Sequence, residues 1–511
     1  MHTIDPQSWK QDMPEFRAKT AAFYAGELDK AAYKGFSGLY GSYAQKGGQA
    51  SMLRLRMTAG RVTKEKLAFT ARAIREHNVP RAHFTTCQTI QLHDLQQDDV
   101  CDIMEKALDA GIVTMGGGGD FPRNVMCSPL SGVEQGEYFD VLPWAEAAGD
   151  YLMHFVKAEK MPRKLKVGFS NSPANVTHAT YRDLGFVARP DGKFDVYCAG
   201  GLGPNPKLGV RVAEAVQPED ILACIDAMIA VFTAFGNYEN RAKARTRYLQ
   251  EVLGEEGLKA EFTKALEAAL AESPKLSCQP QIVDKAADGS VEGPRVIPQK
   301  QAGLYAVSYH PLGGNLPPEK PRALYEIVKD MPQVELRIAP GGTLYIINLT
   351  GREAQAVLAA TEDGANTPFE ASVCCIGASI CQQGVRDSQA LLAEMIAAVR
   401  EAGLPADALP MVHVSGCPSS CGAHQVGALG FQGCVKLVDK KPQPAFNLLV
   451  FGEERQGEER LGEAVGAMLQ TDIPAFMVEL GRTVAASGQP FEAWLSGHRE
   501  ELLALAGRYI G

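Results

Sequence analysis

The sequence predicts a protein of the α+β class, with mixed α/β domains that arose by internal duplication, and two observations support this prediction. Stretches that alternate polar and apolar residues are followed by stretches with helical periodicity, as at 52–57 and 63–77. Residues 415–431 also align without a gap on residues 170–186, and both ends of the alignment coincide. Self-similarity on this scale indicates duplicated domains and not a short-period solenoid.

The first half of the chain alternates predicted strands and helices. Strands are expected where polar and apolar residues alternate, and helices where apolar residues recur every three to four positions. The glycine run Gly116–Gly119 allows the backbone to lie close to a ligand. The predicted helices are 14–28, 63–77, 96–110, 143–158, 218–235 and 240–273, and the predicted strands are 52–57, 83–93 and 163–169, with a hairpin at 191–203.

The second half repeats this pattern. A strand-like stretch at 334–349 followed by a helix at 351–361 resembles the arrangement at 81–110. Residues 275–300 contain prolines and an Asp-Gly-Ser turn signal, and we expect them to be the linker between the two halves.

The aligned loops differ in their chemistry. Each is preceded by a short predicted strand, but Cys417 falls on Ser172 and Cys421 falls on Val176. Only the second copy therefore carries candidate metal ligands, and the first copy is free to carry something else.

Composition excludes several classes of protein. The formal net charge of −9 argues against a general nucleic-acid binder, because neutralising phosphates needs an excess of Lys and Arg. No apolar run is long enough to cross a bilayer, and the polar N-terminus shows no signal peptide, so we expect a cytoplasmic protein without a membrane segment. Twelve cysteines in 511 residues are too sparse for a disulfide scaffold.

Four cysteines form the strongest constellation. Cys375 and Cys381 are separated by five residues, and Cys417 and Cys421 by three, with small residues between them. Four soft thiolates suit one [4Fe–4S] cluster, and the five-residue gap fits a larger core better than it fits the alternative, a tetrahedral zinc ion. Cys374 is a rival ligand, but in an extended segment it would point away from Cys375, which completes Cys-x-Gly-x-x-x-Cys.

Basic residues gather in the first half. From predicted strands and from the glycine loop, their side chains can converge on a small anion, although each taken singly is more often a solvated surface charge. The second basic run, Arg241 to Arg247, suits either cofactor carboxylates or a solvated helix face, and His178 and His424 are expected to be core or surface histidines. The first set is Arg54, Arg56, Arg123, Arg163, Lys164 and Lys166.

Nucleotide chemistry is not supported by the sequence. No glycine-rich phosphate motif follows a strand and opens a helix, so electrons are expected to come from a protein partner.

With these residues in hand, the chain resembles the siroheme- and [4Fe–4S]-containing nitrite and sulfite reductase family over roughly residues 35–480. The motifs that carry the resemblance are Cys375-x5-Cys381, Cys417-x3-Cys421, Met52-Leu-Arg-Leu-Arg56, Arg123-Asn-Val and Pro162-Arg-Lys164-Leu-Lys166. It implies three domains around a central siroheme, with Cys421 linking the cluster to the siroheme iron. It also implies that Arg56, Arg123, Lys164 and Lys166 form the substrate site for a small oxyanion, and that Arg54, Gln91, His93 and Arg245 contact the siroheme.

The resemblance also implies a domain plan. The expected parts are an N-terminal wrapping arm (1–50), a first ferredoxin-like half-domain (51–112), a first reductase repeat on the substrate side (113–274), the linker (275–300), a second half-domain (301–364) and a second repeat that binds the cluster and siroheme (365–511).

The resemblance leaves the substrate open between related anions. A second lysine at Lys166, where nitrite reductases of this family tend to carry Asn, favours the six-electron reduction of sulfite to sulfide with ferredoxin or a similar one-electron donor. Nitrite reduction to ammonia is the nearest alternative, followed by a precorrin-3B synthase-like enzyme and a non-catalytic electron-transfer protein. The chain departs from the family at Cys87 and His83, two positions where the family commonly has Arg.

Overall fold

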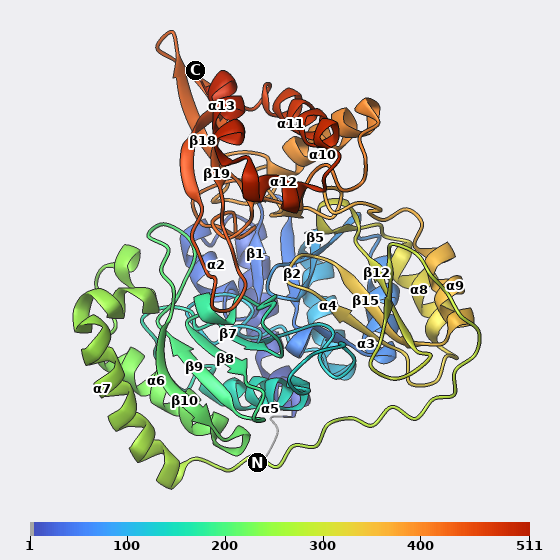
Figure 1. Cartoon of the computed structure of the whole chain (residues 1–511). Helices are drawn as coiled ribbons and strands as arrows, with labels where there is room; N and C mark the ends of the chain where they lie inside the picture. Colours follow the sequence, from blue (N-terminus) through green and yellow to red (C-terminus); the bar gives the residue numbers. More distant parts are fainter. Residues whose placement is uncertain (1–4, 511) are drawn as a thin grey trace.

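The computed structural model describes residues 5–510, and its strands form four five-stranded sheets (Figure 1). The first sheet has the order β1 (Ser42–Ala44), β2 (Ser51–Leu55), β5 (Ile90–Leu95), β4 (Arg81–Phe84) and β13 (Asn315–Leu316). The second has the order β11 (Val296–Pro298), β12 (Tyr305–Tyr309), β15 (Leu344–Leu349), β14 (Glu335–Ile338) and β3 (Arg61–Val62).

Helices and an N-terminal arm surround these two sheets. The arm consists of the 3₁₀ segment Pro6–Asp12, α1 (Met13–Tyr24) and α2 (Lys30–Ser37), and Arg17 on α1 pairs with Asp102 at 2.9 Å on α4. The helices of the half-domains are α3 (Lys64–Glu76), α4 (Gln97–Asp109), α8 (Lys320–Val328) and α9 (Gly351–Ala360).

The other two sheets belong to the long repeats. One has the order β10 (Val210–Val216), β9 (Phe194–Cys198), β8 (Leu184–Ala188), β7 (Val167–Ser170) and β6 (Met126–Cys127), with helices α5 (Leu142–Leu152), α6 (Ile221–Phe235) and α7 (Leu249–Glu272). The other has the order β16 (Val373–Cys374), β17 (Val412–Ser415), β18 (Leu429–Val438), β19 (Lys441–Val450) and β20 (Glu463–Leu469), with helices α10 (Ser388–Ala402), α11 (Ile473–Ser487), α12 (Phe491–Gly497) and α13 (Arg499–Ile510).

The two half-domain sheets exchange a strand. Strand β3 from the first half pairs antiparallel with β14, and β13 from the second half pairs antiparallel with β4. Their apolar faces share one core, in which Phe84 and Leu92 lie in the same buried cluster as Leu336 and Ile346. The half-domains therefore close on each other, since each sheet needs a strand from the other half.

The long repeats confirm the duplication in detail. In both, three strands run parallel and two antiparallel strands follow. Positions that align in sequence share unusual backbone: φ is 50° at Asn175 and 53° at Ser420, and 53° at His178 and 56° at Ala423. Such left-handed φ values are uncommon for non-glycine residues, so their recurrence at the same sequence offset shows that one turn has been used twice.

Several expected boundaries are wrong. Residues 83–93 are not one strand, because a turn separates β4 from β5: Thr85 donates its backbone N–H to the Thr89 carbonyl at 2.9 Å, and Gln88 has φ 55°. Polar-apolar alternation continued through the turn and concealed it. Residues 334–349 form the hairpin β14–β15 for the same reason.

Two further expectations need correction in the first repeat. The helix expected at 240–273 begins at Leu249, and residues 241–248 form 3₁₀ turns, so the basic run does not share a regular helix face. A hairpin was expected at 191–203, but the observed hairpin consists of β8 and β9 and therefore begins at Leu184 and ends at Cys198. Lys164 and Lys166 lie before β7 and not on the strand expected at 163–169. Arg56 lies just after β2 and not on the strand expected at 52–57.

The expected linker crosses the surface for most of its length. Residues 274–295 have no helix or strand, and Figure 1 shows them as a long extended trace from α7 toward β11, which lies inside the 275–300 range. Lys285 ties this trace to Glu353 at 2.6 Å. No helix within residues 5–510 combines the length and apolar character needed to cross a membrane.

The shared turn makes a stability prediction. A Cβ added at Gly185 would lie 1.9 Å from the Ala179 carbonyl oxygen, and one at Gly430 would lie 1.9 Å from that of His424. We expect Gly185→Ala and Gly430→Ala each to destabilise the protein by about 3 kcal/mol, because backbone must move in both repeats. Thermal unfolding midpoints measure this. Gly257→Ala in α7 is the control. If Gly185→Ala or Gly430→Ala unfolded at a midpoint as high as that of the control, the shared packing would be contradicted.

Candidate active site

One cavity of about 680 Å³ lies where the half-domains and the two long repeats meet. All of the residues expected at the site line it, although they come from segments far apart in the sequence. They are Arg54, Arg56, Gln91, His93, Arg123, Lys164, Lys166, Arg245, Cys375, Cys381, Cys417 and Cys421.

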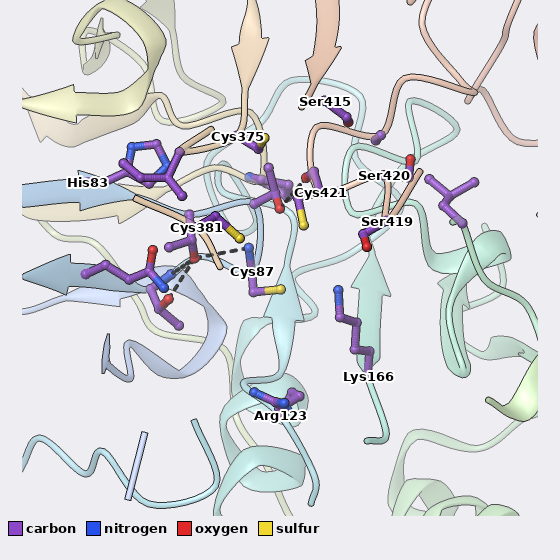
Figure 2. A pocket seen from close by; sticks show the side chains of 18 of the residues that line it. His83, Cys87, Arg123, Lys166, Cys375, Cys381, Ser415, Ser419, Ser420 and Cys421 are labelled. Carbon is purple, nitrogen blue, oxygen red and sulfur yellow. Dashed lines mark hydrogen bonds between the residues drawn. The ribbon is translucent and has the colours of Figure 1, made fainter. Parts of the chain in front are cut away.

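The four thiols occupy two loops at one end of this cavity. Cys375 directly follows β16, and its Sγ accepts a hydrogen bond at 3.2 Å from the backbone N–H of Gly416, at the start of the other loop. Figure 2 shows Cys375, Cys381 and Cys421 gathered around the same space. An added Cβ at Gly416 would lie 2.4 Å from the Arg386 carbonyl oxygen, so only glycine lets the two loops approach this closely.

Burial and neighbouring charges change the pKa values of two of the thiols. Burial, Cys375 and Cys381 raise the pKa of Cys421 to about 12, even though Lys166 and Lys164 act to lower it. Burial raises the pKa of Cys375 as well. Without a cation these thiols stay protonated, whereas bound iron would stabilise them as thiolates.

The thiol arrangement bears on the kind of metal. Within residues 5–510, no group of three or more His, Cys, Asp or Glu side chains is close enough together to hold one metal ion. A [4Fe–4S] core gives each thiolate its own iron, so its ligands surround a volume and do not meet at a point. The donor set fits that group.

Cys374 lies differently from its neighbour. Its Sγ contacts the Cys375 carbonyl oxygen at 3.3 Å, and the side chain is 5% exposed on strand β16. Only the Cys375 thiol is bonded to the loop that carries the second cysteine pair.

Arg56 and Arg123 brace the glycine run on the cavity wall. Arg56 donates from Nη1 to the Met115 carbonyl at 3.2 Å and from Nη2 to the Arg123 carbonyl at 3.3 Å. Arg123 donates to two carbonyls of the run 116–119, at 2.7 Å in the case of Gly119. Burial lowers the pKa of each guanidinium to about 10, which leaves both charged at neutral pH.

Lys164 and Lys166 are cations without a carboxylate partner. No ion pair is found for either ammonium in the described part of the chain, and the backbone of Lys166 is held because its N–H donates to Asp183 at 2.8 Å. Figure 2 shows the Lys166 side chain pointing toward the loop of Ser419 and Cys421. Burial, together with the charge of Lys166, holds the pKa of Lys164 well below its usual range.

The remaining expected residues lie on the cavity wall, and three of them hold a buried nitrogen atom that has no hydrogen-bond partner among the described residues. The Nε atoms of Arg54 and Arg245 and the Nε2 atom of His93 are buried without a hydrogen-bond partner. Arg245 also pairs with the buried Asp183 at 2.9 Å, and Gln91 contacts the sulfur of Met52 at 3.6 Å. Guanidinium groups on a cavity wall suit a large ligand that carries several carboxylates.

The departures from the family motif are also on the cavity wall. Burial would raise the pKa of the Cys87 thiol, but Lys166, Arg182 and other cations lower it to about 6. Burial lowers the pKa of His83 to about 4, so this histidine is uncharged at neutral pH.

Sequence reasoning missed three cavity residues that act together, His178, Arg182 and Glu454. His178 is buried, as one of the two expectations for it allows, and it also borders the cavity. The gap-free alignment held a signal, because it places His178 opposite Ala423. His424 is confirmed as a core residue, with 0% exposure.

Fold and site together define a redox protein with an internal duplication, in which a thiol-lined pocket for an iron–sulfur cluster opens into a cavity for a polyanionic cofactor. Residues 118–270 match the model of the nitrite and sulphite reductase 4Fe-4S domain, and residues 43–110 and 297–363 match that of the nitrite/sulfite reductase ferredoxin-like half domain. The chain belongs to the nitrite and sulfite reductase family, whose members carry siroheme and a [4Fe–4S] cluster.

Individual proteins that are similar to this chain include nitrite reductases and a sulfite reductase. A chloroplastic ferredoxin–nitrite reductase from Zea mays is 27% identical over 422 residues, covering 78% of this chain and 73% of the relative. A ferredoxin–nitrite reductase from Synechococcus elongatus is 26% identical, covering 84% and 85%. Sulfite reductase [ferredoxin] 1 from Mycolicibacterium paratuberculosis is 25% identical, covering 75% and 69%.

A solved structure shares the fold. The Mycobacterium tuberculosis NirA protein superposes with a TM-score of 0.79 at 22% identity, covering 97% of this chain and 95% of that protein.

The two adjacent cysteines provide a test of the ligand set. We expect Cys375→Ala to remove most of the iron and acid-labile sulfide, because its thiol is the one bonded to the second loop, and Cys374→Ala to retain both. Iron and sulfide are assayed per chain in the purified variants. Retention by Cys375→Ala with loss by Cys374→Ala would reverse the assignment.

Proposed function

We propose that the protein reduces sulfite to sulfide with electrons from ferredoxin. The observation that carries this proposal is that Lys164 and Lys166 both line the cavity and that neither ammonium has an ion-pair partner within residues 5–510. Sulfite takes up six electrons and eight protons to give hydrogen sulfide and three waters. Two adjacent ammonium groups balance a doubly charged anion better than a singly charged one.

The proposed roles follow from the positions of the residues. Cys375, Cys381, Cys417 and Cys421 would hold the cluster, and Cys421 would also serve the siroheme iron. Arg54, Gln91, His93 and Arg245 would bind the siroheme from the cavity wall. When bound, the two cofactors would supply a path for the electrons from ferredoxin and the iron site for reduction of the oxyanion.

The cavity cations have two tasks in this proposal. Arg56 and Arg123 are fixed to backbone carbonyls, so they present charge to the anion without first reorganising. Lys164 is suited to donate protons, because burial and neighbouring cations hold its pKa well below its usual range. Each oxygen that leaves as water needs protons from such a donor.

The electron donor and the alternative substrate rest on the relatives. Those from Zea mays, Synechococcus elongatus and Mycolicibacterium paratuberculosis all have ferredoxin in their names, which supports ferredoxin here. The first two are nitrite reductases, which supports nitrite reduction to ammonia as the second candidate function.

The proposed domain plan keeps the boundaries expected from the sequence. The matched half-domain ranges, 43–110 and 297–363, support the proposed 51–112 and 301–364. The matched range 118–270 supports the proposed first repeat at 113–274.

Steady-state assays with reduced methyl viologen test the proposed substrate. We expect kcat/KM for sulfite to exceed that for nitrite when both are measured to saturation on the same preparation. A siroheme visible spectrum must be present first. Nitrite turnover far above sulfite turnover would establish the second candidate instead.

Lys166→Asn tests the charge argument. We expect the sulfite-to-nitrite ratio of kcat/KM to fall about tenfold, equivalent to about 1.4 kcal/mol, because one cation facing the anion is lost. Cluster and siroheme content should stay at the wild-type level. An unchanged ratio would remove Lys166 from the specificity argument.

Lys164→Arg separates charge from proton donation. Arginine keeps the positive charge but holds its proton too tightly to donate it, so we expect kcat to fall about 100-fold while KM changes little. The measurement is the pair of kinetic constants at neutral pH, with Lys264→Arg on exposed α7 as the control. A rise in KM at constant kcat would make Lys164 a binding group only.

A further inference from the structure

A chain of three side chains lines the cavity beside the substrate site. His178 Nε2 lies 2.5 Å from Glu454 Oε2, and the other ring nitrogen, Nδ1, lies 3.4 Å from Arg182 Nη2. All three residues border the same space as Lys166. His178 and Arg182 come from the first repeat, whereas Glu454 comes from the second.

The hydrogen-bond roles in this chain follow from the arginine. A guanidinium can only donate, so Nδ1 of His178 accepts, and Nε2 carries the hydrogen that is donated to Glu454. Arg182 Nε also donates to the Thr177 carbonyl at 2.7 Å. The arginine is therefore held at two of its nitrogens, and among residues 5–510 no hydrogen bond is found for its Nη1.

The second repeat anchors the far end of the chain. Asn175 Nδ2 donates to the Glu454 carbonyl at 2.8 Å, and the Gln456 N–H donates to the Pro173 carbonyl at 2.9 Å. The loop around Glu454 is thereby tied to the turn that holds His178. These contacts fix the position of the Glu454 carboxylate, and the nearby His178 lowers its pKa despite burial.

The duplication shows that the turn itself needs none of these side chains. In the second repeat the residue equivalent to His178 is Ala423, with nearly the same φ, and the residue equivalent to Arg182 is Gly427. An added Cβ at Gly168 would lie 3.3 Å from Arg182 Cγ, and one at Gly427 would lie 2.5 Å from the ring of His413, which is equivalent to Gly168. The space filled by the arginine stem in one repeat is filled by an imidazole in the other.

Within residues 5–510, the guanidinium of Arg182 has no carboxylate partner. Arg182 and Lys166 both act on the Cys87 thiol, so the guanidinium and the ammonium share one part of the cavity. The nearest carboxylates are already used, since Asp183 binds Arg245 and Glu454 binds His178. A half-buried guanidinium with an unused N–H group fits an anion.

We propose that Arg182 is an anion-binding residue of this cavity and that His178 and Glu454 are the positioning residues that aim it. The ligand chemistry is a carboxylate or a small oxyanion, and the two sources are a siroheme side chain and the substrate. The identity of the anion rests on the proposed function, whereas the positioning of Arg182 by His178 and Glu454 does not depend on it.

Arg182→Gln tests the proposal in the holoenzyme. A siroheme content per chain reduced several-fold would identify a siroheme carboxylate as the ligand. Normal siroheme content, with the KM for sulfite raised about tenfold and kcat changed less, would identify the oxyanion. The control is Arg189→Gln, which removes a half-buried arginine that lies just after β8 and pairs with Asp195 at 2.8 Å. Siroheme content and KM both equal to those of the control would overturn the proposal.

His178→Ala and Glu454→Gln test the positioning role. Because Ala423 adopts the same backbone, His178→Ala should fold even where Arg182→Gln does not. His178→Ala should also change whichever of siroheme content and KM for sulfite Arg182→Gln changes, in the same direction but by a smaller amount. In the double variant with Arg182→Gln, His178→Ala should add nothing further. An additive effect would overturn the positioning role. Wild-type protein without a siroheme spectrum would refute the proposed function, whereas a normal wild-type spectrum with unaffected variants refutes only this inference.

Discussion

The exchange of strands between the half-domains is the constraint on which the rest of the structure depends. Strand β3 completes the sheet of the second half, and β13 completes the sheet of the first. At this junction Arg61 pairs with Glu335 at 2.7 Å, and Glu335 also binds Arg337 at 3.0 Å. Losing one partner of such a buried network leaves an uncompensated charge, which costs roughly 3–5 kcal/mol. The halves are therefore held face to face, and the long repeats are held around the cavity between them.

Duplication supplied one backbone for two kinds of chemistry. The turn after β7 and the turn after β17 share their left-handed positions and their close glycine contacts. In one copy the turn presents Cys417 and Cys421, and in the other it presents His178 and leads to Arg182. Because the backbone is common to both, the difference between the copies lies in side chains. The cysteine set and the basic residues thus line one cavity from different repeats.

The cavity is electrically unbalanced in a way that favours anionic ligands. Its carboxylates, Asp183 and Glu454, are occupied in holding Arg245 and His178. Lys164 and Lys166 have no such partner, and burial lowers the pKa of Lys164, which records the cost of keeping that charge away from water. A bound anion offsets this cost. The same charges that disfavour the empty cavity therefore contribute to ligand affinity.

The sequence by itself determined the duplication and most helices, and it singled out the four cysteines proposed as cluster ligands. Each of these depends on local spacing: a gap-free alignment, regular apolar periodicity and two short cysteine motifs. It did not reveal the turn at 85–89, where alternation continues although Thr85 and Thr89 close the chain on itself. Nor did it reveal the strand exchange or the link between His178 and Glu454, residues brought to 2.5 Å from opposite repeats. These depend on how separate segments pack, and no local pattern encodes which distant side chains will meet when the two halves close around one cavity.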